Sequence, residues 1–191
     1  RWPVWLLLCI VTYILLSTYL FLTLSHIEEG HGEYTGNIPT QIVHTAFQND
    51  PFNYNAYSLP YYKEVHIPST EDITLNAWHI KNDHTQPVIV LVSGKDSSKA
   101  DPRMIVIAGM LWKHGFDMLL VDHRNQGNST QTHGRTSLGN DEYDDILASI
   151  QWLTQKGYTE SQIGLMGCSL GAVVNAIAFS ENETIPALFL D

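Results

Sequence analysis

From Tyr62 onward, short apolar segments alternate with segments of helical pattern, and this alternation constrains the fold more than any other feature. The clearest apolar segment, Val88–Val92, reads VIVLV, a β-branched run typical of a strand buried on both faces of a sheet. The other predicted strands are 63–67, 75–80, 116–121, 163–166 and 187–190, and the predicted helices are 104–113, 170–179 and a segment that ends at Lys156. The alternation predicts an α/β fold with a mostly parallel sheet and helices on both faces.

The helix that ends at Lys156 has bounds that follow from its side chains. Its apolar residues recur every three or four positions and share one face: Tyr143, Ile146, Leu147, Ile150 and Leu153. Asn140 or Asp141 is expected to cap the first turn, because a short polar side chain can accept hydrogen bonds from the free backbone N–H groups there. Gly157 is expected to terminate the helix.

The N-terminal segment from Trp2 to Leu24 contains no charged side chain. Its 23 residues would form a helix about 35 Å long, enough to cross the hydrocarbon core of a membrane. A buried core helix would rarely be so long without a polar stripe, and a cleaved signal peptide usually has a shorter apolar region. We therefore predict a transmembrane helix at 2–24, a juxtamembrane linker at 25–60 and a folded domain at 61–191.

Charge is distributed unevenly about the apolar segment. Arg1 precedes it, whereas Glu28, Glu29 and Glu33 follow it. Because cytoplasmic flanks carry the positive excess, the N-terminus is predicted to be cytoplasmic and residues 26–191 extracytoplasmic. The formal net charge of −10 disfavours nucleic acid as a partner, since binding to phosphates requires clustered Lys and Arg. The oligomeric state is left open by the sequence.

Disulfide and metal chemistry have little support in the sequence. Two cysteines, Cys9 and Cys168, are too few for a disulfide framework or a four-cysteine zinc site. His26 and His31 lie near acidic residues, but without an H-E-x-x-H motif or comparable ligand spacing, solvated histidines are the favoured interpretation. No metal and no cofactor are predicted.

Gly167-Cys168-Ser169-Leu170-Gly171 is a G-x-S-x-G motif between a predicted strand and a predicted helix. This is the position of a nucleophile elbow, a sharp turn that lifts a serine hydroxyl out of the end of the sheet. The flanking residues must be glycine because a Cβ would collide with neighbouring chain. The first amides of the following helix would point toward the oxyanion that forms after attack. The alternative is a structural turn in which Ser169 is an ordinary helix cap.

The chain from about Tyr62 onward resembles the α/β-hydrolase superfamily. Its serine hydrolases include Bem46-like proteins, membrane-anchored acylglycerol lipases and S9 peptidases. Besides the elbow, Ser93-Gly94-Lys95 follows a predicted strand where the family has its His-Gly-x oxyanion loop. Residues 122–129 resemble the family's D-x-R-G-x-G-x-S loop, and 137–171 resemble its helix, strand and elbow. These motifs indicate the superfamily but not a substrate.

The resemblance implies a role for each matching residue. Ser169 would be the nucleophile. The backbone N–H groups of Leu170 and Lys95 would form the oxyanion hole, with the Lys95 side chain a solvated surface charge. Asp122 and Arg124 would hold the loop after their strand in place, a structural role rather than a catalytic one.

Three residues depart from the family pattern. Ser93 replaces the usual His and Asn125 replaces the Gly after Arg124, and both are expected to affect the geometry of the oxyanion loop. Cys168 occupies the variable position of the elbow and, because it does not lie at the apex, is not expected to act as the nucleophile.

The superfamily orders its triad as Ser, acid and His, but all nine histidines precede Ser169. Asp191 ends the last predicted strand, one strand before the family's usual acid. Without a general base a serine hydroxyl is a poor nucleophile, so this chain alone is predicted to be inactive. Recruitment of His123 or His133 is a less favoured alternative. We expect the N-terminal part of a longer enzyme, with a pseudoenzyme that keeps only the first half of the fold as the alternative.

The sequence thus predicts a membrane-anchored serine hydrolase that cleaves an ester, thioester or amide through an acyl-enzyme on Ser169. A small-molecule or lipid acyl substrate is favoured, because a bilayer anchor at 2–24 would hold the site near such substrates. An S9-like serine peptidase and a non-catalytic binding module with the same fold are the alternatives.

Overall fold

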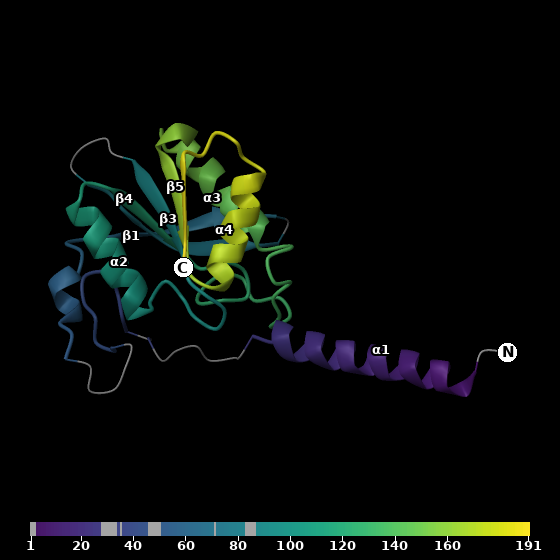
Figure 1. The fold of residues 1–191 in the computed structure, drawn as a ribbon. Coiled ribbons are helices and arrows are strands. Elements are labelled where there is room, and N and C mark those ends of the chain that lie inside the picture. Colours follow the sequence, from purple (N-terminus) through teal and green to yellow (C-terminus); the bar gives the residue numbers. More distant parts are fainter. Residues whose placement is uncertain (1–2, 28–33, 35, 46–50, 71, 83–86) are drawn as a thin grey trace.

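A computed structural model of the chain describes residues 3–27, 34, 36–45, 51–70, 72–82 and 87–191. In these residues six strands form one sheet in the order β1-β2-β4-β3-β5-β6 (Figure 1). The strands are β1 (Lys63–Pro68), β2 (Thr74–Ile80), β3 (Val88–Val92), β4 (Asp117–Val121), β5 (Ile163–Gly167) and β6 (Ala187–Leu190). β2 runs antiparallel to β1 and β4, and the other neighbouring pairs are parallel. The predicted α/β fold with a mostly parallel sheet is confirmed.

Helices cover both faces of this sheet. The covering helices are α2 (Pro102–Lys113), α3 (Tyr143–Gln155), α4 (Leu170–Ser180) and the 3₁₀ helix η1 (Tyr54–Tyr57). The described residues also form the N-terminal helix α1 (Val4–Ser25) and a short 3₁₀ helix, η2 (Glu160–Gln162). α2 and η1 pack into the hydrophobic core on one face, and α3 and α4 pack into the core on the other.

The central strand β3 shows why its sequence is apolar throughout. Val88, Val90 and Val92 pack into the core on the α3 and α4 side, whereas Ile89 and Leu91 pack on the α2 side. Successive side chains of a strand point to opposite faces of the sheet. A strand covered on both faces therefore needs an apolar residue at every position.

Helix α3 begins later than the sequence predicts, and neither Asn140 nor Asp141 caps it. The residue before the helix is Glu142, whose side chain makes no cap hydrogen bond. The buried Glu142 carboxylate instead accepts hydrogen bonds from the backbone N–H groups of Ser137 and Gly139, each at 2.9 Å. The predicted cap was wrong because Asn140 and Asp141 lie inside the turn that these hydrogen bonds close.

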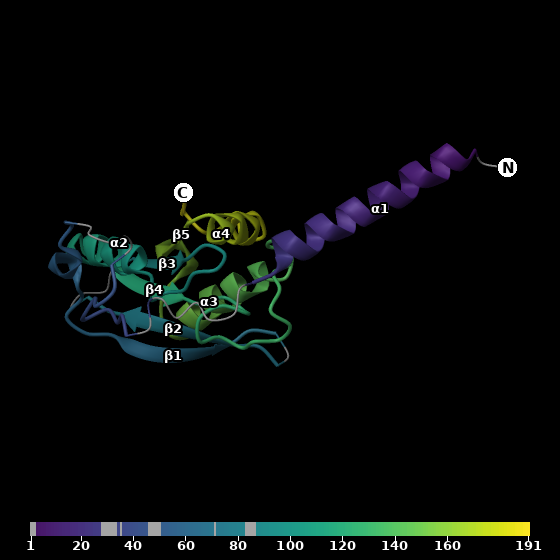
Figure 2. The ribbon, with the colours of Figure 1, turned by 90° about the horizontal axis from the view of Figure 1, so that it is seen from below.

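Helix α1 extends away from the domain in both views of the ribbon (Figures 1 and 2). Its most apolar 18-residue window has a mean hydropathy of 2.2, and none of that window is buried. By length and composition α1 is able to cross a membrane, and an N-terminal signal sequence would have the same properties.

Part of the segment predicted as a linker at 25–60 packs on the domain. Ile42, Tyr54 and Leu59 are buried in the core on the α2 side. The side-chain oxygen of Asn37 accepts hydrogen bonds from the backbone of the 43–44 segment, each at 2.8 Å. The expectation of a linker followed from a polar, glycine-rich composition, but a few well-spaced apolar side chains suffice to fix such a segment on a core.

Some of the predictions concern residues outside the described ranges. These are Arg1, Trp2, Glu28, Glu29, His31 and Glu33.

A buried polar cluster at the amino end of β4 contains a histidine with a perturbed pKa. Tyr158 donates a hydrogen bond to Asp117 at 2.5 Å, and its hydroxyl oxygen lies 3.3 Å from Nε2 of His79. His79 is only 8% exposed. Burial first, and then the positive charge of Lys81 and two further lysines, lower the pKa of His79 to about 4.

We expect His79 to make the domain less stable in acid. Because the pKa of His79 is near 4 when folded and about 6.5 when unfolded, the unfolded chain binds the proton more tightly. The contribution of His79 to the free energy of unfolding is therefore complete above pH 6.5 and decreases by about 3 kcal/mol as the pH falls toward 4. Urea unfolding across this range measures the effect. His79→Phe keeps an aromatic ring without a titrating group, so the variant should lose that part of the pH dependence, and an unchanged dependence would contradict the assignment.

Candidate active site

Ser169 lies at the turn between β5 and α4, where its backbone has φ 52° and ψ −117°. A positive φ is uncommon for a residue with a Cβ and marks a strained turn. Three backbone hydrogen bonds hold the turn: Cys168 N–H to Val92 O at 3.1 Å, Ser169 N–H to Asp191 O at 2.7 Å, and Asp191 N–H to Gly167 O at 3.0 Å. The turn leaves Ser169 exposed at the carboxyl edge of the sheet.

The two glycines of the motif have no room for a side chain. A Cβ on Gly167 would lie 2.3 Å from the carbonyl oxygen of Gly171. A Cβ on Gly171 would lie 2.5 Å from the carbonyl oxygen of Val92 and 2.6 Å from that of Ser93. The packing of backbone against backbone explains why both positions are glycine.

The hydroxyl group of Ser169 does not cap α4. The residue occupies the N-cap position, but its side chain makes no cap hydrogen bond. This geometry argues against the alternative of an ordinary structural cap. Leu170 is the first residue of α4, and the N–H groups of a first helical turn have no acceptor within the helix and carry its positive dipole end.

Gly94 brings the predicted oxyanion loop beside Ser169. A Cβ on Gly94 would lie 3.1 Å from Cβ and 3.6 Å from Oγ of Ser169. Val92 pairs with Gly167 in the parallel register, so the loops after β3 and β5 leave the sheet at the same edge. Ser93, at 2% exposure, is buried at the start of this loop. The Lys95 side chain makes an ion pair with Asp96 at 2.7 Å, which leaves its backbone N–H as the candidate oxyanion donor.

Cys168 lies next to the candidate nucleophile but has the chemistry of an inert thiol. Burial first, and then the negative charge of Asp191, raise the pKa of the Cys168 thiol. Because the thiolate is the reactive form of cysteine, a raised pKa makes Cys168 a poor nucleophile.

Asp122 anchors the loop that follows β4. Its carboxylate forms a buried ion pair with the ammonium group of Lys99 and accepts hydrogen bonds from the backbone N–H groups of Lys99 at 2.6 Å and Asn128 at 3.0 Å. A Cβ on Gly127 would lie 2.1 Å from an Asp122 oxygen, so the loop closes tightly over the carboxylate. These contacts support a structural role for Asp122. Sequence reasoning missed Lys99, although a carboxylate directly after a buried strand indicates that a buried cation must lie nearby.

Arg124 and its neighbour hold the same loop from the other side. Arg124 forms an ion pair with the fully buried Asp145 at 2.7 Å, and its backbone N–H donates to the same carboxylate at 2.8 Å. Asn125, where the family has glycine, has φ 63°, and its side-chain oxygen accepts the backbone N–H of Thr132 at 2.7 Å. Asparagine tolerates this left-handed conformation, so the departure preserves the turn.

His123 and His133, the two histidines considered as alternative bases, lie in the loop after β4. His123 is fully buried, with Nε2 3.1 Å from the side-chain nitrogen of Gln126 and Nδ1 3.3 Å from the carbonyl oxygen of Arg124. His133 is exposed. Among the described residues, no hydrogen bond joins either histidine to Ser169.

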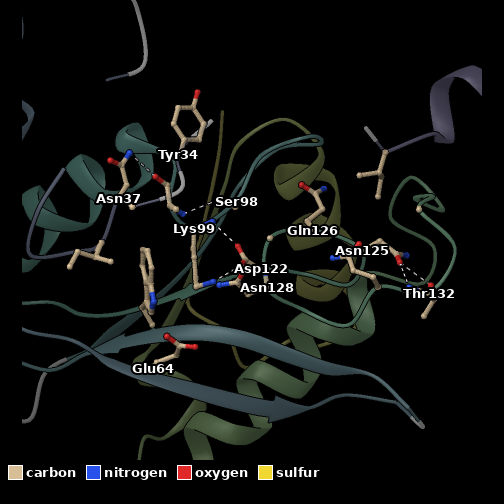
Figure 3. A pocket seen from close by; sticks show the side chains of 18 of the residues that line it. Tyr34, Asn37, Glu64, Ser98, Lys99, Asp122, Asn125, Gln126, Asn128 and Thr132 are labelled. Atoms are coloured by element: carbon tan, nitrogen blue, oxygen red, sulfur yellow. Dashed lines mark hydrogen bonds and ion pairs between the residues drawn. The ribbon is translucent and has the colours of Figure 1, made fainter. Parts of the chain in front are cut away.

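A cavity of about 910 Å³ lies between the segment after α1, strands β1 and β2, and the loops at 98–100 and 122–135. Figure 3 shows Lys99, Asp122 and Asn128 together at its centre and Glu64 on the side of β1. The Lys99 ammonium group lies 5.0 Å from the ring centre of Trp78 in its wall. Ser169 is not among the described residues that line this cavity, which is therefore distinct from the elbow.

Comparisons with known proteins agree with the α/β-hydrolase fold. The model of the X-Pro dipeptidyl-peptidase (S15) family matches residues 37–189. Lysophospholipase L2 of Escherichia coli (strain K12) is 27% identical over 119 residues, which cover 60% of this chain and 34% of that protein. The esterase Pf2001 of Pyrococcus furiosus is 27% identical with a TM-score of 0.60, covering 76% of this chain and 56% of the esterase. The α/β hydrolase GrgF of Penicillium sp. sh18 is 22% identical with a TM-score of 0.64, covering 69% and 45%.

These relatives place the chain within a known superfamily. The chain spans about one third of the curated relative and about half of the two solved structures. GrgF supports the fold alone, whereas the esterase and the lysophospholipase are also relatives in sequence. The sequence resemblance to the α/β hydrolases is confirmed, and the peptidase family whose model matches is S15, where the motifs alone had suggested S9. The match at 37–189 includes the elbow and both loops beside it, and the chain belongs to the X-Pro dipeptidyl-peptidase (S15) family of the α/β-hydrolase superfamily.

Proposed function

We propose that the protein is a membrane-anchored serine hydrolase that cleaves an ester, thioester or amide through an acyl-enzyme on Ser169. The observation that carries this proposal is the turn at Ser169, with its φ of 52°, its exposure and a hydroxyl group that caps no helix. A strained turn that presents an unused hydroxyl contributes nothing to packing, whereas a nucleophile requires that arrangement.

In the proposed reaction, Oγ of Ser169 attacks the carbonyl carbon of the substrate while its proton passes to a general base. The carbonyl oxygen becomes negatively charged, and the backbone N–H groups of Leu170 and Lys95 would donate hydrogen bonds to it. The bond to the alcohol, thiol or amine then breaks, and the leaving group takes the proton. Water cleaves the acyl-enzyme by the same route and restores the hydroxyl group. Among the described residues, no hydrogen bond joins the Ser169 hydroxyl group to a histidine or carboxylate that could be this base.

An acyl lipid or a small acyl compound is the substrate class that we favour. Helix α1 supports this choice, because an apolar helix anchored in a bilayer would hold the domain near lipid esters. Two relatives in sequence are named as an esterase and a lysophospholipase, and both names denote ester cleavage. We further propose that the N-terminus is cytoplasmic and the hydrolase domain extracytoplasmic.

A peptidase is the second candidate, and the family match favours it. The family that matches residues 37–189 is described as X-Pro dipeptidyl-peptidase, whose substrate bond is an amide. Ester and amide cleavage use the same nucleophile and oxyanion hole, so the elbow does not distinguish them.

The nucleophile is tested by labelling the protein expressed from its gene with a fluorophosphonate probe. An activated serine displaces fluoride from the probe and becomes covalently labelled. We expect labelling of the unchanged protein and complete loss of labelling in Ser169→Ala. Ser161→Ala, which removes an exposed serine in η2, serves as the matched control and should label normally. Labelling of Ser169→Ala, or of neither protein, would contradict the proposal.

The two candidate functions are separated on protein that has not been treated with the probe, because the covalent label blocks Ser169. 4-Nitrophenyl acyl esters of increasing chain length report esterase activity, and Gly-Pro-4-nitroanilide reports the peptidase. We expect turnover of the esters that rises with chain length and little release of nitroaniline. Preferential cleavage of the anilide would identify a peptidase.

A further inference from the structure

Helix α1 ends on a fixed contact with the domain. The carbonyl oxygen of Ser25 accepts a hydrogen bond from the backbone N–H of Thr136 at 2.8 Å, and the N–H of Ile27 donates to the carbonyl oxygen of Gly134 at 2.9 Å. Ser25 is fully buried and Ile27 is 4% exposed. Two backbone hydrogen bonds and two buried residues make this junction a docked segment instead of a flexible tether.

Arg135 strengthens the junction at the end of the helix. Its guanidinium group donates hydrogen bonds to the carbonyl oxygen of Leu22 and to the hydroxyl group of Ser25, both at 3.2 Å. The last carbonyl groups of a helix have no partner within it and carry its negative dipole end, so a cation is stabilising there. Arg135 thereby joins α1 to the loop that follows β4.

The docked loop continues directly to an exposed apolar residue, Leu138. The N–H of Leu138 donates to the hydroxyl oxygen of Thr136 at 2.9 Å, and its backbone has φ 58°. Hydrogen bonds from Ser137 and Gly139 to the buried Glu142 carboxylate hold this conformation, which is uncommon for leucine. The result is a leucine side chain that is 45% exposed and fixed on a rigid loop.

This loop lies against α4, which carries a second exposed apolar residue. A Cβ on Gly139 would lie 3.1 Å from Cγ1 of Val173, and Val173 is 47% exposed. The N–H of Val173 donates to the carbonyl oxygen of Ser169 at 3.2 Å, so Val173 lies one helical turn after the candidate nucleophile. We call the exposed part of Leu138 and Val173 the Leu138–Val173 surface.

We propose that the Leu138–Val173 surface contacts the lipid bilayer into which α1 inserts, so that the elbow takes acyl chains directly from the membrane. This inference rests on the proposed function, because it requires α1 as an anchor and Ser169 as the nucleophile. Lipid is favoured as the occupant because this surface is connected to the end of the proposed anchor α1. The contacts lead from the end of α1 through Thr136 to Leu138, and from Gly139 to Val173. Exposed Asp141, three residues after Leu138, favours zwitterionic over anionic lipid.

The test places an environment-sensitive fluorophore on this surface. In a Cys9→Ser, Cys168→Ala background, Leu138→Cys is labelled with a nitrobenzoxadiazole dye and reconstituted in phosphatidylcholine vesicles. We expect a blue-shifted emission and strong quenching by phosphatidylcholine that carries a doxyl group on its acyl chain. Met110→Cys on α2, exposed to a similar extent at 39%, is the matched apolar control and should be neither shifted nor quenched.

Each outcome separates this inference from the proposed function. Equal quenching at both positions, or none at residue 138, would overturn the bilayer contact, and a further domain that covers the surface would give the second result. Arg135→Ala should reduce the quenching at residue 138, because it loosens the junction. Fluorophosphonate labelling of parallel vesicles, which hold the protein with Cys168 unchanged, reports Ser169 independently, and vesicle flotation reports the anchor. If the fluorophosphonate labels Ser169 and the protein floats with the vesicles, but the dye at residue 138 is not quenched, the inference alone is contradicted. If the protein does not float, the anchor and the inference are contradicted together.

Discussion

Asp122→Asn is expected to lower the free energy of unfolding by about 3–5 kcal/mol, because breaking a buried ion pair strands the remaining charge. The Lys99 and Asp122 side chains are 2% and 0% exposed, so water cannot replace the lost partner. Asparagine keeps one acceptor oxygen but places an amide where the carboxylate accepts backbone N–H groups of Lys99 and Asn128. Urea unfolding of the detergent-solubilised protein, followed by far-UV circular dichroism, measures the change.

A surface ion pair of the same chemistry provides the control for this experiment. Lys95 and Asp96 are joined at 2.7 Å, but each side chain is 27% exposed. Asp96→Asn should therefore change the free energy of unfolding by no more than about 1 kcal/mol. Similar losses in the two variants would show that burial does not determine the importance of Asp122.

The elbow and the central strands were predictable because their determinants are local in sequence. A strand buried on both faces must be apolar at every position, so VIVLV alone locates β3 at Val88–Val92. The turn at Ser169 follows from five consecutive residues, two of which must be glycine for steric reasons that the structure shows at Gly167 and Gly171. Local rules of this kind need no knowledge of distant contacts.

The parts that sequence reasoning missed depend on pairs that are distant along the chain. Lys99 lies 23 residues before Asp122, and nothing in the spacing marks the two as partners. The contact between Arg135 and the end of α1 joins residues more than 100 positions apart. The segment after α1 was therefore predicted as a linker, although its first residues dock on the domain.

Glu142 shows a different limit of sequence reasoning. Burial by itself would raise the pKa of its carboxyl group, but hydrogen bonds from Ser137, Thr136 and Gly139 outweigh burial and lower the pKa. A glutamate beside a helix start is usually interpreted as a favourable charge for the helix dipole. Here it organises the preceding loop, and only the three-dimensional arrangement of the donors distinguishes the two roles.

Gly171→Ala is expected to lower the free energy of unfolding by about 3 kcal/mol or more and to abolish fluorophosphonate labelling. Alanine is favoured over glycine within a helix by about 1 kcal/mol, so propensity alone would predict a more stable α4. The new Cβ, however, would lie 2.5 Å from the carbonyl oxygen of Val92 and 2.6 Å from that of Ser93. Both are backbone atoms at the end of the central strand, so relief requires α4 to move away from the sheet, and Ser169 would move with it.

A glycine that faces a flexible side chain makes the matched control. A Cβ on Gly164 in β5 would lie 2.8 Å from Cδ1 of Ile89, a terminal atom that is able to rotate away. Gly164→Ala should therefore cost about 1 kcal/mol and retain labelling, since overpacking against a movable side chain is at the low end of its usual cost. Urea unfolding and probe labelling of both variants decide the issue. If Gly171→Ala is as stable and as reactive as Gly164→Ala, α4 does not need to approach β3 this closely, and the steric explanation of the elbow fails.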